Sequence, residues 1–264
     1  MSDAIFFRDG FHFVPTDLAR GPWSRHAQHG GPPTALLARS VERYDDGERM
    51  FVARLTIELL RPIPIAPLVV RERLLRPGKK VQLIEASLFA EEVEVARCTA
   101  LRIRRAEISL PSGLPTVPSP PGPEAGITSG PRSAESAGEA FHSHAVEHRF
   151  VAGGFDRPGP ATDWIRLRVP LVRGERTSPL CRVAAAADFG NGVSSIVNPA
   201  EGYLFINPDL TVYLDRYPGG EWVCLDAVTY VQPHGVGLAE SLIFDEHGPI
   251  GRAVQSLLLE KLSV

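Results

Sequence analysis

Cysteine is scarce in this sequence, and its placement excludes the usual cysteine-based structures. The 264 residues include only Cys98, Cys181 and Cys224, which are far apart and form no C-x-x-C pair. An odd, widely spaced set predicts neither a disulfide framework nor a cysteine zinc site. Free thiols suit a reducing compartment, so we expect a cytoplasmic location.

Long apolar runs and a strong net charge are also missing. No segment approaches the roughly 20 apolar residues of a membrane-spanning helix, and the start, MSDAIFFRDG, does not resemble a signal peptide. The formal net charge of −3 predicts no basic surface for nucleic acid. We therefore expect a soluble protein with no membrane or nucleic-acid partner.

Several catalytic signatures are absent as well. There is no G-x-S-x-G nucleophile elbow, which argues against an α/β-hydrolase. There is no nucleotide-phosphate loop and no G-x-G-x-x-G fingerprint. The eight histidines show no spacing typical of a metal site. The sequence predicts no metal and no cofactor.

Proline and glycine, by contrast, are abundant, at 24 residues each, and many lie between residues 106 and 139. Proline fixes φ and removes a backbone donor, so this stretch cannot form a central strand or a helix. We interpret it as an extended linker over the surface. A second interpretation, a lid over a functional site, stays open.

The segments on either side of this linker repeat one another. FVARLTIELLRP (51–62) resembles FINPDLTVYLDRYP (205–218), with Leu55 matching Leu210 and Arg61 matching Arg216. The offset of 155 residues holds, with almost no gaps, through the segments that follow. We infer a duplicated chain with units at 1–105 and 140–264.

Each unit has the same predicted order, a strand, a helix of small residues and then antiparallel strands. The helices are expected at 29–44 and 178–190, the first opening on prolines that suit a first helical turn. Residues 51–59 alternate apolar and polar side chains, as in a half-buried strand. The pattern is α+β. Further strands are expected at 11–14, 67–75, 80–90 and 93–104, and at 146–151, 221–231, 235–245 and 249–261.

With these elements, the chain resembles the double-hotdog acyl-CoA thioesterases of the thioesterase II type. The resemblance rests on QHGGPPTALLARSVE, RLTIELLRPIP and RPGKKVQLIEASLF, and on NPDLTVYLDR, EWVCLDAVTYV and GRAVQSLLLEK. It covers both units and fails only in the linker. It implies a double hotdog, in which antiparallel sheets wrap around central helices, and an enzyme that hydrolyses an acyl-CoA substrate.

The same resemblance implies an active site of Asp, Thr or Ser, and Gln, all from the second unit. Matching the segments places these residues at Asp209, Thr229 and Gln255, and a one-residue shift selects Tyr230 instead of Thr229. We interpret Asp209 as the general base, and Thr229 and Gln255 as the groups that orient the attacking water.

The repeat supports these positions independently. The first unit has Arg54, Leu75 and Ala100 there, so the polar set belongs to the second unit alone. Thr229 and Gln255 each interrupt an apolar strand face, where an unpaired polar group costs roughly 1–3 kcal/mol. Structural interpretations stay open: a threonine that only packs, an amide that faces solvent and a carboxylate in a turn.

His29, Gly30 and Gly31 stand at the start of the first predicted helix. Backbone N–H groups at a helix start favour anions, so the Gly31 N–H is expected to stabilise the thioester oxyanion. His29 is expected to bind substrate or to position the helix. The alternative is a histidine that only hydrogen-bonds within the turn.

Two other functions stay open. Hotdog hydratases that act on enoyl-CoA carry a histidine soon after an Asn-Pro pair, whereas here Asn207-Pro208 is followed by Asp209-Leu210. A non-catalytic acyl-CoA binding module is the second alternative, since binding and hydrolysis use the same pocket. The sequence leaves the acyl chain type open and allows a monomer or a homo-oligomer joined through its sheets.

Overall fold

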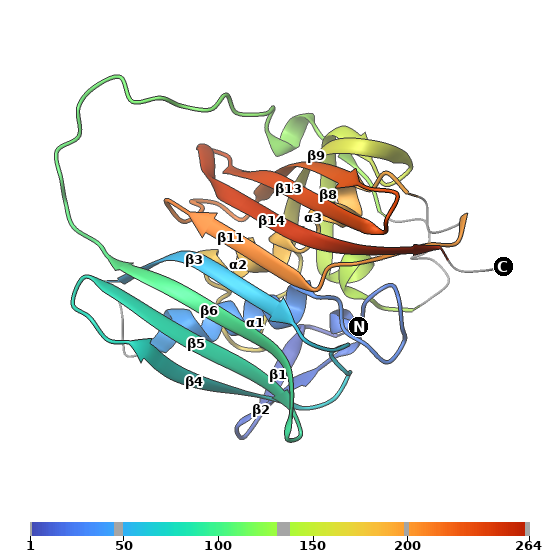
Figure 1. Cartoon of the computed structure of the whole chain (residues 1–264), viewed down its shortest axis with the longest axis horizontal. Helices are drawn as coiled ribbons and strands as arrows, with labels where there is room; N and C mark the ends of the chain where they lie inside the picture. Colours follow the sequence, from blue (N-terminus) through green and yellow to red (C-terminus); the bar gives the residue numbers. More distant parts are fainter. Residues whose placement is uncertain (1, 45–49, 131–137, 198–200, 262–264) are drawn as a thin grey trace.

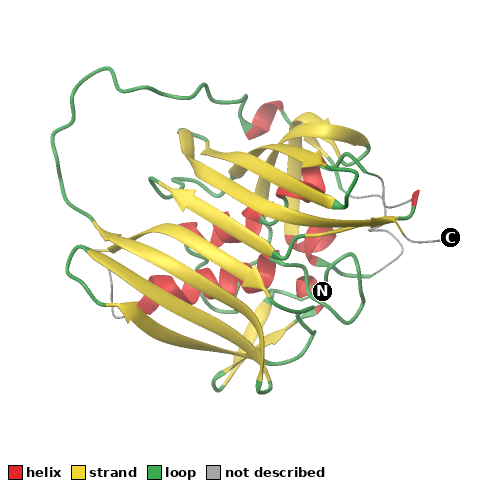
Figure 2. Ribbon diagram, viewed as in Figure 1, coloured by secondary structure: helices red, strands yellow, loops and turns green. Residues whose placement is uncertain are grey.

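The computed structural model describes residues 2–44, 50–130, 138–197 and 201–261. Their strands form one continuous antiparallel sheet, and the three α-helices pack against one face of it (Figures 1 and 2). The helices are α1 (Gly31–Arg43), α2 (Pro179–Ala187) and α3 (Gly190–Ser194), with short helical turns η1 (Asp17–Ala19), η3 (Pro123–Ala125) and η5 (Phe141–Ala145).

The strand order is nearly a palindrome, because the two units present the same series from the centre outward. The first series, starting from the centre, is β3 (Met50–Leu59), β6 (Val93–Arg104), β5 (Val81–Ala90), β4 (Leu68–Arg76), β2 (His12–Pro15) and β1 (Phe6–Asp9). The second is β11 (Asp209–Leu214), β14 (Gly248–Lys261), β13 (Val236–Asp245), β12 (Val223–Val231), β9 (Arg157–Leu167) and β8 (Val146–Gly154). β7 (Ile127–Thr128) extends the second edge, and β10 (Tyr203–Ile206) pairs with β14.

The two units meet where β3 pairs with β11. Thr56 lies directly opposite Thr211, and these residues are equivalent in the sequence repeat. Leu55 faces Val212, and Leu210 faces Ile57, so the pairing is centred on the equivalent threonines. Two identical elements that meet at equivalent residues are related by a two-fold axis. The predicted double hotdog is therefore confirmed.

The register corrects one detail of the repeat. Thr229 pairs with Ala239 on β13, and at the equivalent place in the first unit Leu74 pairs with Ile84. The counterpart of Thr229 is thus Leu74 and not Leu75, which lies in a register irregularity immediately after it. The first unit therefore still has an apolar residue at the position equivalent to Thr229.

Both predicted helices are present with shifted boundaries. The helix predicted at 29–44 begins at Gly31, and the one predicted at 178–190 is divided into α2 and α3 with Asp188 and Phe189 between them. The strands β1, β7, β9 and β10 were not predicted, because short or glycine- and proline-containing stretches lack a clear period of two.

Small residues allow the central helices to approach one another closely. A side chain at Gly31 would place its Cβ 2.8 Å from the carbonyl oxygen of Ala185 in α2. On α1, Ala35, Leu36 and Leu37 are fully buried under the sheet. The close approach brings the start of α1 against the end of α2, where the candidate site lies.

The predicted linker arcs away from the sheet and reaches the outer face of the second unit near Pro121 (Figure 1). No helix or strand occurs from 105 to 122, in accordance with its proline content, but η3 and β7 follow (Figure 1). The indole N–H of Trp164 donates to the carbonyl of Pro121, at 2.8 Å. Trp164 packs with Trp222, Cys224 and Phe244 on the opposite face of the sheet from the helices. Residues 131–137 of the linker lie outside the described part.

The cysteines are buried and unpaired. Burial in an apolar surrounding disfavours the thiolate and raises the pKa of Cys181 to about 12. Among the helices that the structure describes, none has the length and apolar character required to cross a membrane.

We expect Gly251→Ala to destabilise the protein by about 1–3 kcal/mol, because the new methyl group overpacks two adjacent strands. A Cβ at Gly251 on β14 would lie 2.0 Å from the carbonyl oxygen of Tyr213 on β11. Urea unfolding measures the loss. Gly130→Ala is the matched control, since its Cβ meets no atom within 4 Å; it should change stability by no more than about 0.5 kcal/mol. Equal stabilities for the two variants would contradict the prediction.

Candidate active site

Thr229 and Gln255 lie side by side on the inner face of the second unit's sheet. Both pair with Ala239, Thr229 from β12 and Gln255 from β14, so they flank it on one face. Their side chains are buried against α3. Gln255 Oε1 accepts from the backbone N–H of Asn191 at 3.2 Å, and Thr229 Oγ1 lies 2.7 Å from Ser194 Oγ.

The hydroxyl network fixes which group donates. Ser194 O–H donates to the carbonyl of Gly190 at 2.8 Å, so Thr229 donates its one hydrogen to Ser194 Oγ at 2.7 Å, in preference to Asn191 Oδ1 at 3.5 Å. The lone pairs of Thr229 Oγ1 then remain available to accept a further hydrogen bond.

Tyr230 faces the other way. It is 50% exposed, and its hydroxyl lies 3.4 Å from Glu240 on the outer face. Successive strand residues alternate between faces, so only one of Thr229 and Tyr230 can point at the helices. Thr229 is the one that does.

The predicted convergence of Asp209 with Thr229 and Gln255 is wrong. Asp209 Oδ1 accepts from the backbone N–H of Ser256 at 2.7 Å, and Ser256 is exposed on the outer face of β14. Gln255, one residue before, points inward. The repeat located the strand of Asp209 but could not show that its side chain lies across the sheet from the site.

A different aspartate lies beside Gln255. Asp188 follows α2, and its side chain is buried. Its backbone carbonyl accepts from Gln255 Nε2 at 3.2 Å. Its carboxylate lies 2.9 Å from His29 Nδ1 and accepts from Asn207 Nδ2 at 2.9 Å. Asp188, Thr229 and Gln255 thus surround the α2–α3 junction.

Gly30 and Gly31 allow this carboxylate to reach the start of α1. A Cβ at Gly30 would lie 2.7 Å from both carboxylate oxygens, so a side chain there would displace Asp188. The Gly31 N–H hydrogen-bonds to the carboxylate, and the partial positive charge of the α1 N-terminus favours an anion there. The site therefore joins the second unit's carboxylate to the first unit's helix.

The surroundings keep Asp188 ionised. Burial alone would raise its pKa, but the hydrogen bonds from His29, Asn207 and the Gly31 N–H outweigh burial and hold the pKa below its ordinary value. An ionised, buried carboxylate is a proton acceptor held in one place.

The Gly31 N–H, expected at the oxyanion, is engaged within the protein. Its nitrogen lies 3.0 Å from His29 Nδ1 as well as near Asp188. A ring nitrogen that donates its proton to Asp188 cannot also accept, so the carboxylate is the better acceptor for this N–H. In this arrangement Gly31 stabilises the Asp188 carboxylate.

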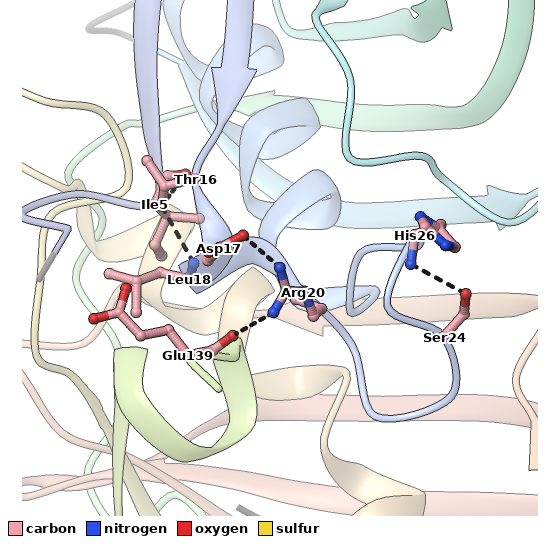
Figure 3. Close-up of polar contacts among 8 residues, drawn as sticks. All are labelled: Ile5, Thr16, Asp17, Leu18, Arg20, Ser24, His26 and Glu139. Atoms are coloured by element: carbon pink, nitrogen blue, oxygen red, sulfur yellow. Dashed lines mark hydrogen bonds and ion pairs between the residues drawn. The ribbon is translucent and has the colours of Figure 1, made fainter. Parts of the chain in front are cut away.

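Arg20 fixes the segment that leads to His29. Its guanidinium lies 2.5 Å from Asp17 and donates to the carbonyl of Glu139 at 3.4 Å (Figure 3). Its own carbonyl accepts from the backbone N–H of Phe141 at 2.9 Å. The Phe141 ring in turn packs 5.1 Å from the His29 ring, between centroids. Arg20 therefore links the first unit to the start of the second beside the site.

The sequence contains a signal for Asp188 that the segment matching missed. In VAAAADFGNGVS (183–194), Asp188 is the only charged residue. A single carboxylate in a run of buried small residues requires a partner, because an unpaired buried charge is costly. Treating this stretch only as a helix end concealed it.

No group of three or more histidine, cysteine, aspartate or glutamate side chains is arranged to hold a metal ion in the described ranges. The donors around Asp188 are one histidine and amide groups. The arrangement is suited to proton transfer and to binding water.

The comparisons with known proteins agree with this fold. Residues 19–103 match the acyl-CoA thioesterase N-terminal domain, and residues 111–259 match the acyl-CoA thioesterase C-terminal domain. The fold and these matches define a double-hotdog thioester hydrolase. The chain belongs to the acyl-CoA thioesterase family.

Solved structures show the same fold at low sequence identity. A conserved hot dog protein of unknown function from Alicyclobacillus acidocaldarius is 16% identical, with 99% and 98% of the two chains covered and a TM-score of 0.76. A putative thioesterase II from Thermobifida fusca is 16% identical, with 98% and 96% covered and a TM-score of 0.75. The acyl-CoA thioesterase II TesB2 of Mycobacterium marinum is 19% identical, with 90% and 91% covered and a TM-score of 0.63. A search of curated proteins found no match.

We expect the stability difference between wild type and Asp188→Asn to shrink as the pH falls. The folded-state pKa of Asp188 lies below the unfolded value, so its contribution is present above about pH 4 and is lost as the pH falls through the folded pKa. Urea unfolding from pH 7 to pH 3 measures the difference. Thr229→Val, which removes no titrating group, should differ from wild type by a constant amount. A difference for Asp188→Asn that does not change with pH would contradict the assignment of an ionised carboxylate.

Proposed function

We propose that this protein hydrolyses acyl-CoA thioesters to a free acid and CoA by direct attack of water, with Asp188 as the general base. The observation that carries the proposal is that Asp188, whose buried carboxylate is held ionised, contacts Gln255 through its backbone carbonyl at the α2–α3 junction, where Thr229 also lies. Asp188 takes the place that the sequence assigned to Asp209.

The proposed reaction begins with the proton of a bound water. Asp188 accepts it as the water oxygen attacks the thioester carbonyl carbon, which becomes tetrahedral. Collapse of this intermediate breaks the carbon–sulfur bond, and the proton held by Asp188 passes to the departing thiolate. The products are the free acid and CoA, and the carboxylate is regenerated.

Thr229 and Gln255 orient the water in this proposal. Thr229 Oγ1 accepts one water hydrogen, since its own hydrogen is donated to Ser194. Gln255 Nε2 uses one N–H on the Asp188 carbonyl and has a second one for the water or the carbonyl oxygen. This second N–H replaces the engaged Gly31 N–H as the donor to the oxyanion.

His29, Gly30 and Gly31 act on the base in this proposal. His29 donates to the carboxylate and fixes its direction, and the two glycines let it lie against the α1 start. The acyl-CoA substrate would approach between the two units, where these residues meet. The expectations of a cytoplasmic location, and of a monomer or homo-oligomer, stay predictions.

We expect Asp188→Asn to reduce kcat by roughly 10²–10⁴-fold, because it keeps the shape of the side chain and removes the base. Release of free CoA thiol from a panel of acyl-CoAs measures the rate, with and without EDTA. Asp209→Asn is the matched control and should retain full activity, since its side chain lies on the outer face. Full activity in a folded Asp188→Asn variant would overturn the proposal, as would equal losses in both variants. Loss of hydrolysis in EDTA would refute the absence of a metal.

The neighbouring pair Thr229 and Tyr230 gives a second test. Thr229→Val keeps the volume and removes the acceptor for water, so kcat should fall roughly tenfold or more, as expected for the loss of a buried hydrogen bond. Tyr230→Phe removes an exposed hydroxyl and should leave kcat unchanged. The reverse result would show that the inward face of β12 has been wrongly assigned.

A non-catalytic acyl-CoA binding module predicts a different outcome in the same assay. Such a protein would bind acyl-CoA without releasing thiol at any substrate length.

A further inference from the structure

A second buried polar pair lies near the site but takes no part in the proposed mechanism. His148 on β8 and Asp163 on β9 have side chains 2% and 0% exposed, and His148 Nδ1 lies 2.6 Å from Asp163 Oδ2. Across the ladder they face Ile165 and Phe150, which belong to the core under the helices. A histidine and a carboxylate on this apolar face require a reason, since their burial costs free energy.

The other ring nitrogen of His148 carries a hydrogen in the two net-neutral states that place a proton between Nδ1 and Asp163 Oδ2 and leave no hydroxyl unpaired. In an ion pair, both ring nitrogens are protonated. In a neutral pair, Asp163 keeps its proton and donates it to Nδ1, so the ring's own hydrogen must be on Nε2. Two states leave Nε2 without a hydrogen. One has a net negative charge, which burial opposes, and burial likewise raises the pKa of Asp163. The other puts the proton on Asp163 Oδ1, which is buried with no partner in the described part of the chain, so this hydroxyl would be unsatisfied.

This Nε2 donor is buried and has no protein partner among the described residues. Buried donors are nearly always satisfied, so this one is suited to an acceptor that the chain does not provide. Asp163 prevents the ring from turning to find another partner, because it holds Nδ1.

Phe189 connects the donor to the candidate active site. Its ring centroid lies 4.8 Å from that of His148 and 4.6 Å from that of His29, and it directly follows Asp188 in the chain. Phe150 and Phe155 pack against the same imidazole. Phe189 therefore places the His148 ring one aromatic ring away from His29, the residue that holds the Asp188 carboxylate.

His142 adds a second unpartnered nitrogen near these aromatic rings. Its Nδ1 is buried without a protein partner in the described part of the chain, and its ring lies 6.3 Å from that of His29, between centroids. Burial, followed by the nearby His29 and His148, lowers the pKa of His142 to about 3, so the ring is neutral. A neutral ring has one acceptor nitrogen, which suits a hydroxyl hydrogen.

We propose that His148, held by Asp163, determines substrate specificity by donating a hydrogen bond from Nε2 to a hydroxyl group on the acyl chain. The preferred substrates are then short hydroxyacyl-CoA thioesters, and the aromatic rings around Phe189 enclose the rest of the chain. This inference rests on the proposed function, because it assigns the acyl group of the same site.

The wild-type enzyme provides the first test. Thiol release is measured with short acyl-CoAs that carry a hydroxyl at the 3- or 4-position and with the matched chains that lack it. We expect at least one hydroxyacyl-CoA to have a kcat/KM roughly tenfold or more above its unsubstituted partner, because the buried donor is left unpaired by the latter. Hydrolysis of both series without any preference overturns the inference and leaves the proposed function intact.

Variants then assign the preference to His148. His148→Phe should abolish it while changing kcat/KM for the unsubstituted chain only a few-fold, roughly the effect of one packing change. His148→Gln retains a side-chain N–H donor and should keep part of the preference. His144→Phe, at an exposed histidine of the same segment, is the matched control and should keep all of it. A preference that survives His148→Phe overturns the assignment. If His148→Phe does not fold, the assignment is overturned when His148→Gln and Asp163→Leu both keep the full wild-type preference.

Binding separates failure of this inference from failure of the proposed function. If no acyl-CoA is hydrolysed, the thioesterase proposal fails, and calorimetry with hydroxyalkyl and alkyl CoA thioethers still decides the inference. Tighter binding of the hydroxylated thioether, lost in His148→Phe, supports it. Equal binding of the two overturns it.

Discussion

The structure depends on one buried carboxylate that belongs to one unit and is stabilised by the other. Asp188 ends the central helix of the second unit, and its charge is compensated by His29 and by the helix start at Gly31 in the first. Burial of that charge is tolerable only with all of these donors in place. The absence of a side chain at Gly30 and the close contact of α1 with Ala185 follow from the same constraint. The interface between the units and the candidate active site are therefore a single arrangement.

Duplication supplies the scaffold, and divergence between the copies supplies the chemistry. The sheet is symmetric about the Thr56–Thr211 pair, and both copies bury apolar residues under their helices. At the positions of Thr229 and Gln255, however, the first unit has Leu74 and Ala100. The first unit keeps an apolar interior there and contributes its helix start. Only the second unit has polar side chains, Thr229 and Gln255, at these positions of the inner face.

The junction of the two units is also unusual in the imidazoles it contains. His29, His142 and His148 surround a cluster of phenylalanine rings, and a stack of this kind combines an apolar surface with a few fixed donors and acceptors. Ligand sites in proteins are commonly built in this way, with specificity set by the few polar atoms. In our proposal these rings also discriminate between acyl chains.

The sequence by itself determined the duplication, the α+β order and the resemblance to double-hotdog thioesterases, because periodicity, repeat offset and motifs are read directly from the order of residues in the chain. It also indicated that Thr229 and Gln255 interrupt apolar faces, which the structure places inward. It contained a signal for the carboxylate, the lone charge of Asp188 among small residues, but no indication of the partners of Asp188. Asp209 lies in a correctly identified strand, but strand pairing turns it outward beside Ser256. Asp188 is 67 residues from Gln255 in the chain, and only the packing of α2 against α1 and the sheet brings them together. Long-range packing decides such contacts, so the tertiary structure alone identified the candidate base.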